Sequence, residues 1–171
     1  PNPLVFGHGC ALLQQAGIDV QTGLMIEQAR TLNIGFVTRM TQHRPWIRLK
    51  TAASLDGGTA LSNGVSQWIT GEAARRDGHR WRARSCAVMT GSGTLLSDDP
   101  QLTVRNIQTP RQPKRMLIDR NLVIPMDAKL LQGGEVFILT TSDNKNKIEK
   151  LRESGAHVIE LTPLVQSEHG V

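Results

Sequence analysis

The chain has 171 residues, 39% of them hydrophobic and 20% charged, a composition typical of one globular domain and not of a disordered chain. No apolar run approaches the roughly 20 residues of a membrane-spanning helix, and the first residues lack the basic and apolar regions of a signal peptide, so we expect a cytoplasmic protein. The net charge of +5 indicates either an anionic partner or no particular partner, and both interpretations are open. Phosphorylated small molecules and nucleic acid are both candidates, although 4% aromatic residues and no Lys/Arg block longer than a pair argue against nucleic acid.

Helical and strand-like segments alternate along the chain. We expect a helix over 23–38, a buried strand over 46–53 and a helix from the N-cap Thr70 to about Arg84. A strand over 86–90 and one helical turn over 94–99 should follow. The rest of the chain should form strands over 115–119 and 135–140, a helix over 145–154 and a strand over 157–161. Strands separated by helices predict an α/β fold with an at least partly parallel sheet.

The segment from Lys50 to Thr70 has the composition of a binding loop. Small residues follow an apolar run, and Asp56-Gly57-Gly58 is a strong turn signal. Hydroxyl groups and the indole of Trp68 come soon after the turn. This combination suits a polar, flat, partly aromatic ligand better than a packed interior.

Six basic side chains lie on the predicted helix over 71–84. They form two rows at helical spacing, Arg75/His79/Arg82 and Arg76/Arg80/Arg84. A solvated basic face is the simplest interpretation for all of them except Arg82. The helix of Arg82 directly follows the binding loop, so its guanidinium could reach an anion held there.

A strand end, a glycine turn and a short helix meet in the segment from Gly91 to Arg105. This arrangement could bind a phosphate or a polar cofactor edge, although no complete dinucleotide-binding or P-loop motif is present. Taken alone, Asp98 and Asp99 are more typical of a helix stop or cap than of catalysts. Cys10 and Cys86 are expected to be buried, reduced thiols, and the five histidines show no metal-ligand spacing.

These motifs occur together and in order. Lys50-x-Ala52-x-Ser54-Leu55-Asp56-Gly57, Ser66-Gln67-Trp68-Ile69-Thr70, Arg82 and Thr94-Leu95-x-x-Asp98-Asp99-Pro100-x-Leu102-Thr103-x-Arg105 resemble the reductase domain of the bifunctional riboflavin biosynthesis deaminase/reductase. The resemblance covers nearly the whole chain. It implies that residues 1–22 are the tail of a deaminase domain and a linker. Residues 23–171 would be the reductase domain, ending before its C-terminal glycine-rich segment.

The resemblance also implies a fold, a reaction and a set of site residues. The fold would be like dihydrofolate reductase, with a mixed, mostly parallel sheet. The reaction would be reduction of 5-amino-6-(5-phosphoribosylamino)uracil to its ribitylamino product by NADPH, in a homodimer without metal. NADPH would contact Ala52, Trp68, Thr94 and Asp98, and the phosphorylated pyrimidine would contact Ser66, Arg82, Leu102 and Arg105.

Two further residues, Lys50 and Arg120, complete the set of candidates. Lys50 borders the binding loop and is our candidate for the group that polarises or protonates the sugar, against the alternative of an ordinary strand-end lysine. Arg120 stands where the family often has a small hydroxyl residue, and could meet the 2′-phosphate of NADPH or point to solvent.

The His-x-Glu and Pro-Cys-x-x-Cys zinc signature of the deaminase is absent from this sequence, so no deamination is expected from this chain.

Two other function classes stay open at this point. A catalytically silent fragment that provides only dimer contacts is one alternative. A basic nucleic-acid-binding module is the other.

Overall fold

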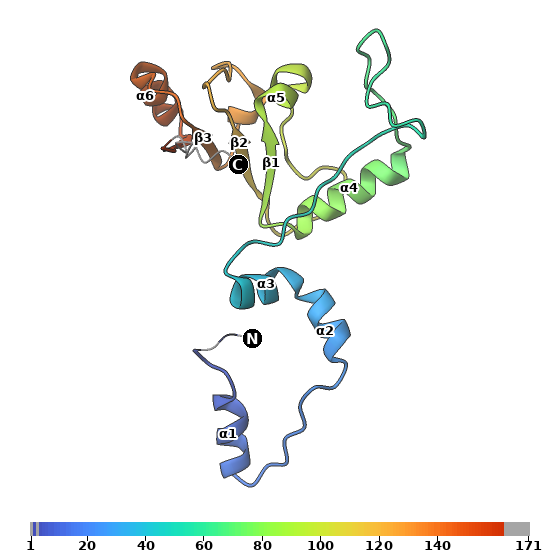
Figure 1. Cartoon of the computed structure of the whole chain (residues 1–171), viewed down its shortest axis with the longest axis vertical. Helices are drawn as coiled ribbons and strands as arrows, with labels where there is room; N and C mark the ends of the chain where they lie inside the picture. Colours follow the sequence, from blue (N-terminus) through green and yellow to red (C-terminus); the bar gives the residue numbers. More distant parts are fainter. Residues whose placement is uncertain (1, 3, 163–171) are drawn as a thin grey trace, which may run out of the picture. The chain divides into compact units, whose positions relative to one another are not determined.

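The computed structural model describes residues 2 and 4–162 (Figure 1). The chain divides into two compact units, Pro1–Thr51 and Ala52–Val171. The first unit contains the helices α1 (His8–Gln15), α2 (Ile26–Leu32) and α3 (Ile34–Gln42). The second contains α4 (Glu72–Arg84), β1 (Ala87–Gly91), α5 (Ser92–Asp98), β2 (Lys114–Ile118), the 3₁₀ turn η1 (Lys129–Leu131), β3 (Val136–Thr140), α6 (Lys145–Glu153) and β4 (His157–Glu160).

The single helix expected over 23–38 is two helices, with a break at Asn33. The backbone of Asn33 leaves the helical region, at φ −108° and ψ 25°. Its side-chain amide donates to the carbonyl of Ala29 at 2.9 Å, so the side chain competes with the backbone for a helical acceptor. The apolar spacing therefore continues across a break that one asparagine causes.

The strand expected over 46–53 does not form. Ile47 and Leu49 are 69% and 84% exposed, and none of the strands in the described residues pairs with this stretch. An apolar run becomes a strand only when a neighbouring strand pairs with its N–H and C=O groups, and sequence pattern alone cannot supply that partner.

The turn expected at Asp56-Gly57-Gly58 is present. The amide of Gly57 donates to the carbonyl of Ser54 at 2.9 Å, and the amide of Ser54 donates to the carbonyl of Gly58 at 2.9 Å. Gly57 has φ +85°, a left-handed conformation that favours glycine. The Ser54 hydroxyl donates to the Asp56 carboxylate, and this bond is the main cause that lowers the pKa of Asp56.

Helix α4 begins one residue later than expected. Its N-cap is Gly71 and not Thr70, and no side chain caps it. The carbonyl of Thr70 instead accepts a hydrogen bond from the Arg75 guanidinium. The end of the helix at Arg84 agrees with the prediction.

Four parallel strands form one sheet in the order β1-β2-β3-β4. One row of registered residues, Thr90, Leu117, Ile138 and Val158, crosses the sheet on its covered face. Leu117 and Ile138 are completely buried. Burial of each side chain stabilises the folded state by about 1.5–3 kcal/mol relative to leaving it exposed to water. Helix α6 completes this core with Ile148 and Leu151, and α5 adds Leu95. The predicted α/β fold with a parallel sheet is therefore confirmed.

Two buried charged side chains hold the connection between β2 and β3. The Asp119 carboxylate, fully buried at the end of β2, accepts the amides of Val123 at 2.9 Å and Ile124 at 2.8 Å. The Arg115 guanidinium donates to the carbonyls of residues 132, 133 and 134. Burial lowers the pKa of Arg115, and the three carbonyls satisfy its donors.

Two remaining sequence expectations concern the thiols and the membrane. Cys86 is exposed and Cys10 is half-buried, so the expectation of two buried thiols is wrong, although both are free. Cys10 lies within α1 and Cys86 directly precedes β1, and neither belongs to the core of the sheet. Within residues 2 and 4–162, no helix has both the length and the apolar character to cross a membrane.

Candidate functional site

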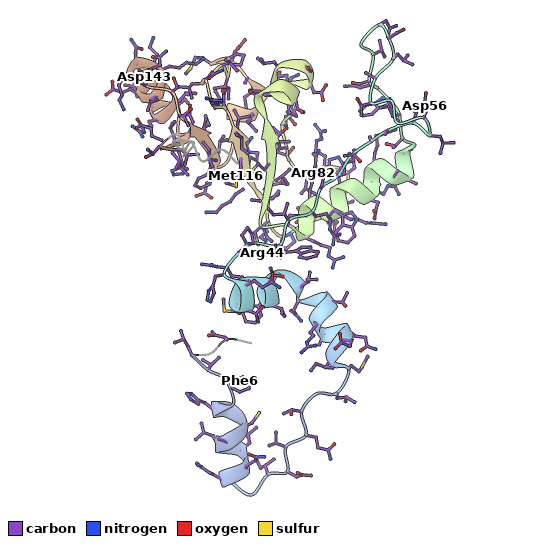
Figure 2. The ribbon with its side chains drawn as sticks, in the orientation of Figure 1. Phe6, Arg44, Asp56, Arg82, Met116 and Asp143 are labelled. Carbon is purple, nitrogen blue, oxygen red and sulfur yellow. The ribbon has the colours of Figure 1, made fainter. Side chains whose placement is uncertain are left out.

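Helix α4 and the segment 101–105 form a cluster of basic side chains, which we call the arginine cluster: His79, Arg82 and Arg105. Arg82, labelled in Figure 2, is half-buried, and its Nη1 donates to the carbonyl of Thr103 at 3.0 Å. The amide of Arg105 donates to Nδ1 of His79 at 3.1 Å. His79 and Arg82 are three residues apart and therefore share one face of the helix. Two side chains of one helix thus fix the segment that carries Arg105.

The arginine cluster has positive charge without a local counter-ion. In the part of the chain that the structure describes, neither Arg82 nor Arg105 forms an ion pair with a carboxylate. Burial and the nearby Arg105 charge lower the pKa of Arg82. Burial, followed by the charges of Arg82 and Arg105, also lowers the pKa of His79. The charge of Arg105 disfavours the charged forms of both Arg82 and His79, so an anion would relieve the repulsion.

The segment 101–105 is held from a second direction. The side-chain amide of Gln112 pairs with both backbone groups of Val104, accepting its amide at 2.7 Å and donating to its carbonyl at 3.2 Å. Leu102 is buried and has φ +56°, an uncommon conformation for a residue with a side chain. The guanidinium of Arg105 stays exposed, with Nη1 donating to Gln101 Oε1 at 3.2 Å. The backbone is fixed while the charged end is accessible.

Three of the residues expected to contact the cofactor lie at one edge of the sheet. Thr94 and Asp98 are exposed on α5, which directly follows β1 (Figure 1), and Arg120 is exposed two residues after β2. Strands β1 and β2 are parallel neighbours, so these side chains share the carboxyl edge of the sheet. Clefts at such edges are the usual ligand sites of parallel α/β sheets.

The neighbouring Asp99 has a structural role in this structure. It ends α5 in a left-handed conformation at φ +40°, and its carboxylate accepts the amide of Lys129 at 2.9 Å. The Lys129 ammonium lies 3.2 Å from the same carboxylate. These contacts lower the pKa of Asp99, the backbone bond being the largest cause. The interpretation of Asp99 as a helix stop is therefore confirmed.

The other expected site residues are on irregular segments. Ala52 and Ser66 are half-buried, and Trp68 is 70% exposed. The Arg75 guanidinium lies 4.5 Å from the centre of the Trp68 ring, which places the indole beside the first turns of α4. From Arg75 to Arg82 the helix rises roughly 10 Å, at about 1.5 Å per residue. Trp68 and the arginine cluster therefore lie by different ends of the same helix.

Lys50 is exposed and belongs to the first unit. Its catalytic role stays a prediction.

Among the described residues, no group of three or more His, Cys, Asp or Glu side chains is arranged to hold a metal ion.

Sequence reasoning missed His79. It assigned this residue to a solvated basic face, whereas the structure shows it half-buried against the amide of Arg105. The spacing of His79 and Arg82 was the available signal, because a residue three positions before a candidate anion-binding arginine shares its face. The contact itself joins positions 26 residues apart, and no local pattern shows it.

Comparison with known proteins agrees with this architecture. The sequence model of the RibD C-terminal domain matches residues 45–169. The riboflavin biosynthesis protein RibD of Aquifex aeolicus is 44% identical over 160 residues, which are 93% of this chain and 45% of the relative. The RibD of Escherichia coli is 46% identical over 160 residues, covering 86% of this chain and 44% of the relative.

Solved structures show the same likeness. A structure of Acinetobacter baumannii RibD is 44% identical with a TM-score of 0.84, over 96% of this chain and 46% of that one. A Thermotoga maritima protein, described as a diaminohydroxyphosphoribosylaminopyrimidine deaminase/5-amino-6-(5-phosphoribosylamino)uracil reductase, is 30% identical with a TM-score of 0.76, over 92% of this chain and 50% of that one. This chain spans half or less of the length of these relatives.

The parallel α/β sheet and these matches define an α/β domain of the RibD type. The chain belongs to the RibD C-terminal domain family. The resemblance seen in the sequence motifs is thereby confirmed.

Proposed function

We propose that this chain carries the reductase activity of its family, the reduction of 5-amino-6-(5-phosphoribosylamino)uracil to 5-amino-6-(5-phosphoribitylamino)uracil with NADPH. The name of the Thermotoga maritima relative includes a reductase of this substrate. Family membership supports the reaction class, and the arginine cluster supports a phosphorylated substrate.

The observation that carries the proposal is the pair of uncompensated arginines. Arg82 and Arg105 have no carboxylate partner among the described residues, yet one is half-buried and both are tied to the segment 101–105. A guanidinium binds a phosphate by charge-assisted, often paired hydrogen bonds. The substrate phosphate is the ligand that this chemistry fits best.

The remaining substrate contacts would come from Ser66 and Leu102. Leu102 precedes the tied residues of the segment and is buried, so its backbone has a fixed place beside the arginine cluster. The Ser66 hydroxyl can donate to or accept from the pyrimidine or sugar. Together these residues would orient the sugar carbon that reacts.

The residues at the carboxyl edge of the sheet fit the chemistry of NADPH. The Thr94 hydroxyl and Asp98 carboxylate can bind ribose hydroxyls, and the exposed Arg120 guanidinium can bind a phosphate. Ala52 and the indole of Trp68 would provide a small, close backbone contact and an aromatic surface. When bound, NADPH supplies the hydride that the reaction needs.

The chain's own groups would align the reactants and supply a proton. The opened sugar is an imine at C1, so a hydride added to C1 must be accompanied by a proton on the nitrogen. Lys50 is the proposed donor of this proton or the group that polarises the sugar oxygen. We also propose that the complete protein is a homodimer, as the family resemblance implies, and that the reductase domain begins near residue 23.

The test uses the whole chain with NADPH and the phosphorylated substrate. We expect loss of NADPH absorbance that depends on the substrate, with a product heavier by two hydrogens in mass spectrometry. Tryptophan fluorescence should change when NADPH binds, and Trp68→Phe should remove the change while Trp46→Phe keeps it. NADPH binding without oxidation would favour the silent fragment, and salt-sensitive DNA binding without any NADPH response would favour the nucleic-acid module.

A further inference from the structure

The side chain of His79 has a defined hydrogen-bonding role inside the arginine cluster. Its Nδ1 lies 3.1 Å from the backbone nitrogen of Arg105, and this nitrogen can only donate. Nδ1 must therefore carry a lone pair, and the ring proton must be on Nε2. The structure requires a neutral imidazole of one tautomer.

The charges around His79 favour the same state. Arg82 faces it from α4, and Arg105 faces it from the segment 101–105. A protonated ring would be a third positive charge in the cluster and would turn the Nδ1 acceptor into a second donor, opposite the Arg105 amide. Burial and the two arginines lower the pKa of His79, so the neutral ring is the stable form at neutral pH.

The bond to His79 is one of four, made by three side chains, that set the path of the segment. Arg82 binds the carbonyl of Thr103, Gln112 binds both backbone groups of Val104, and His79 binds the amide of Arg105. The bond to His79 is thus the last of these along the segment, and it is made at the residue whose guanidinium is exposed. Without it, the backbone of Arg105 would be held only through its neighbour.

We propose that His79 is a positioning residue of the substrate-phosphate site, and that its neutral imidazole aims the Arg105 guanidinium by accepting the Arg105 amide. The inference rests on the proposed function, because it assigns Arg105 to the substrate phosphate. His79 does not touch the reacting atoms in this account. Its loss should raise the substrate KM and leave kcat nearly unchanged.

Two substitutions separate hydrogen bonding from packing. In His79→Asn the side-chain oxygen can take the place of Nδ1, whereas His79→Leu fills similar space without an acceptor. We expect His79→Leu to raise the substrate KM roughly 3- to 10-fold, the value of one net hydrogen bond, and His79→Asn to restore most of the loss. Arg80→Gln, an exposed basic residue on the same helix, is the matched control and should match the unmodified chain.

The pH profile provides a readout that a packing role would not change. In the unmodified chain, log(1/KM) should fall as the pH drops through the lowered pKa of His79, because protonation removes the acceptor. His79→Asn does not titrate there, so its profile should keep only the fall that protonation of the substrate phosphate causes in both proteins. The amide proton of Arg105, followed by NMR, should shift over the same pH range only in the unmodified chain.

The outcomes distinguish the two claims. Equal KM values for His79→Leu and the unmodified chain, or a failure of His79→Asn to restore KM in a folded protein, would overturn the positioning role. An Arg105 amide that does not respond to pH would overturn it as well. If the unmodified chain shows no saturable dependence on the phosphorylated substrate, the proposed function fails and takes this inference with it.

Discussion

Replacing Arg82 by glutamine should weaken binding of the phosphorylated substrate more than any other single change on α4. Arg82 is half-buried and donates to the Thr103 carbonyl at 3.0 Å, so its side chain is already ordered before an anion arrives. Glutamine keeps a hydrogen-bond donor but is shorter and uncharged. The variant therefore removes the charge and the reach together.

The size of the effect follows from the bond that is lost. A hydrogen bond to a charged group contributes about 1.5–3 kcal/mol, and about 1.4 kcal/mol corresponds to a tenfold change in affinity. The substrate KM should therefore rise about 10- to 100-fold in Arg82→Gln. Loss of the Thr103 contact should also lower the free energy of unfolding by about 1 kcal/mol. The KM for NADPH should change less than about twofold, which corresponds to a binding free energy of roughly 0.4 kcal/mol.

The assay is the initial rate of NADPH oxidation at varied substrate concentration. Arg82→Lys keeps the charge but not the forked donor set, and should lie between glutamine and the unmodified chain. Arg84→Gln is the control, because Arg84 is exposed at the end of α4, with its guanidinium 4.8 Å from the centre of the Trp81 ring. Equal KM values for Arg82→Gln and Arg84→Gln would refute the assignment of Arg82 to the phosphate.

Three further predictions concern stability. Asp119→Ala should lower the free energy of unfolding by about 2–4 kcal/mol in urea denaturation, because the buried Ile124 amide loses its hydrogen-bond acceptor. Asp119→Asn keeps an acceptor and should lower it less. Equal free energies of unfolding for Asp119→Ala and the unmodified chain would contradict this. Arg115→Met should lower the free energy of unfolding by about 2–4 kcal/mol in urea denaturation, because three carbonyls lose their donor. Arg111→Met is the control and should have a smaller effect, because Arg111 donates to one carbonyl. Hydrogen bonds from Lys145 and Arg152 lower the pKa of Glu160, so the ionised carboxylate stabilises the fold. The unmodified chain should therefore have a higher free energy of unfolding than Glu160→Gln at neutral pH, and the difference should vanish as the pH falls through that lowered pKa. A difference that persists in acid would contradict the role of the ion pairs.

The sheet could be predicted from the sequence because its signals are local. Each of the four strands contains a short apolar stretch, and the four predicted ranges agree with β1 to β4 within about two residues, the usual uncertainty of strand ends. The strand expected over 46–53 has the same apolar character but does not form. Its failure shows that pairing, a nonlocal property, decides whether such a run becomes a strand.

The site was predictable only in part. Resemblance identified Arg82, Leu102 and Arg105, and the structure brings these residues together around the segment 101–105. Their roles toward a substrate stay predictions. The contact of His79 with Arg105 could not be read from local sequence, because it depends on how this segment returns to α4. Spacing along the helix shows which side chains share a face, but not what that face meets.

The central claim is that the arginine cluster binds the substrate phosphate of an NADPH-dependent reductase. Calorimetric titration of the whole chain, in the presence of NADP⁺ so that no turnover occurs, with the phosphorylated substrate and with the same compound lacking its phosphate tests this claim most directly. We predict that removal of the phosphate weakens binding about 10-fold or more, and that Arg82→Gln loses most of this difference. Equal affinities of the unmodified chain for the two compounds would contradict the claim.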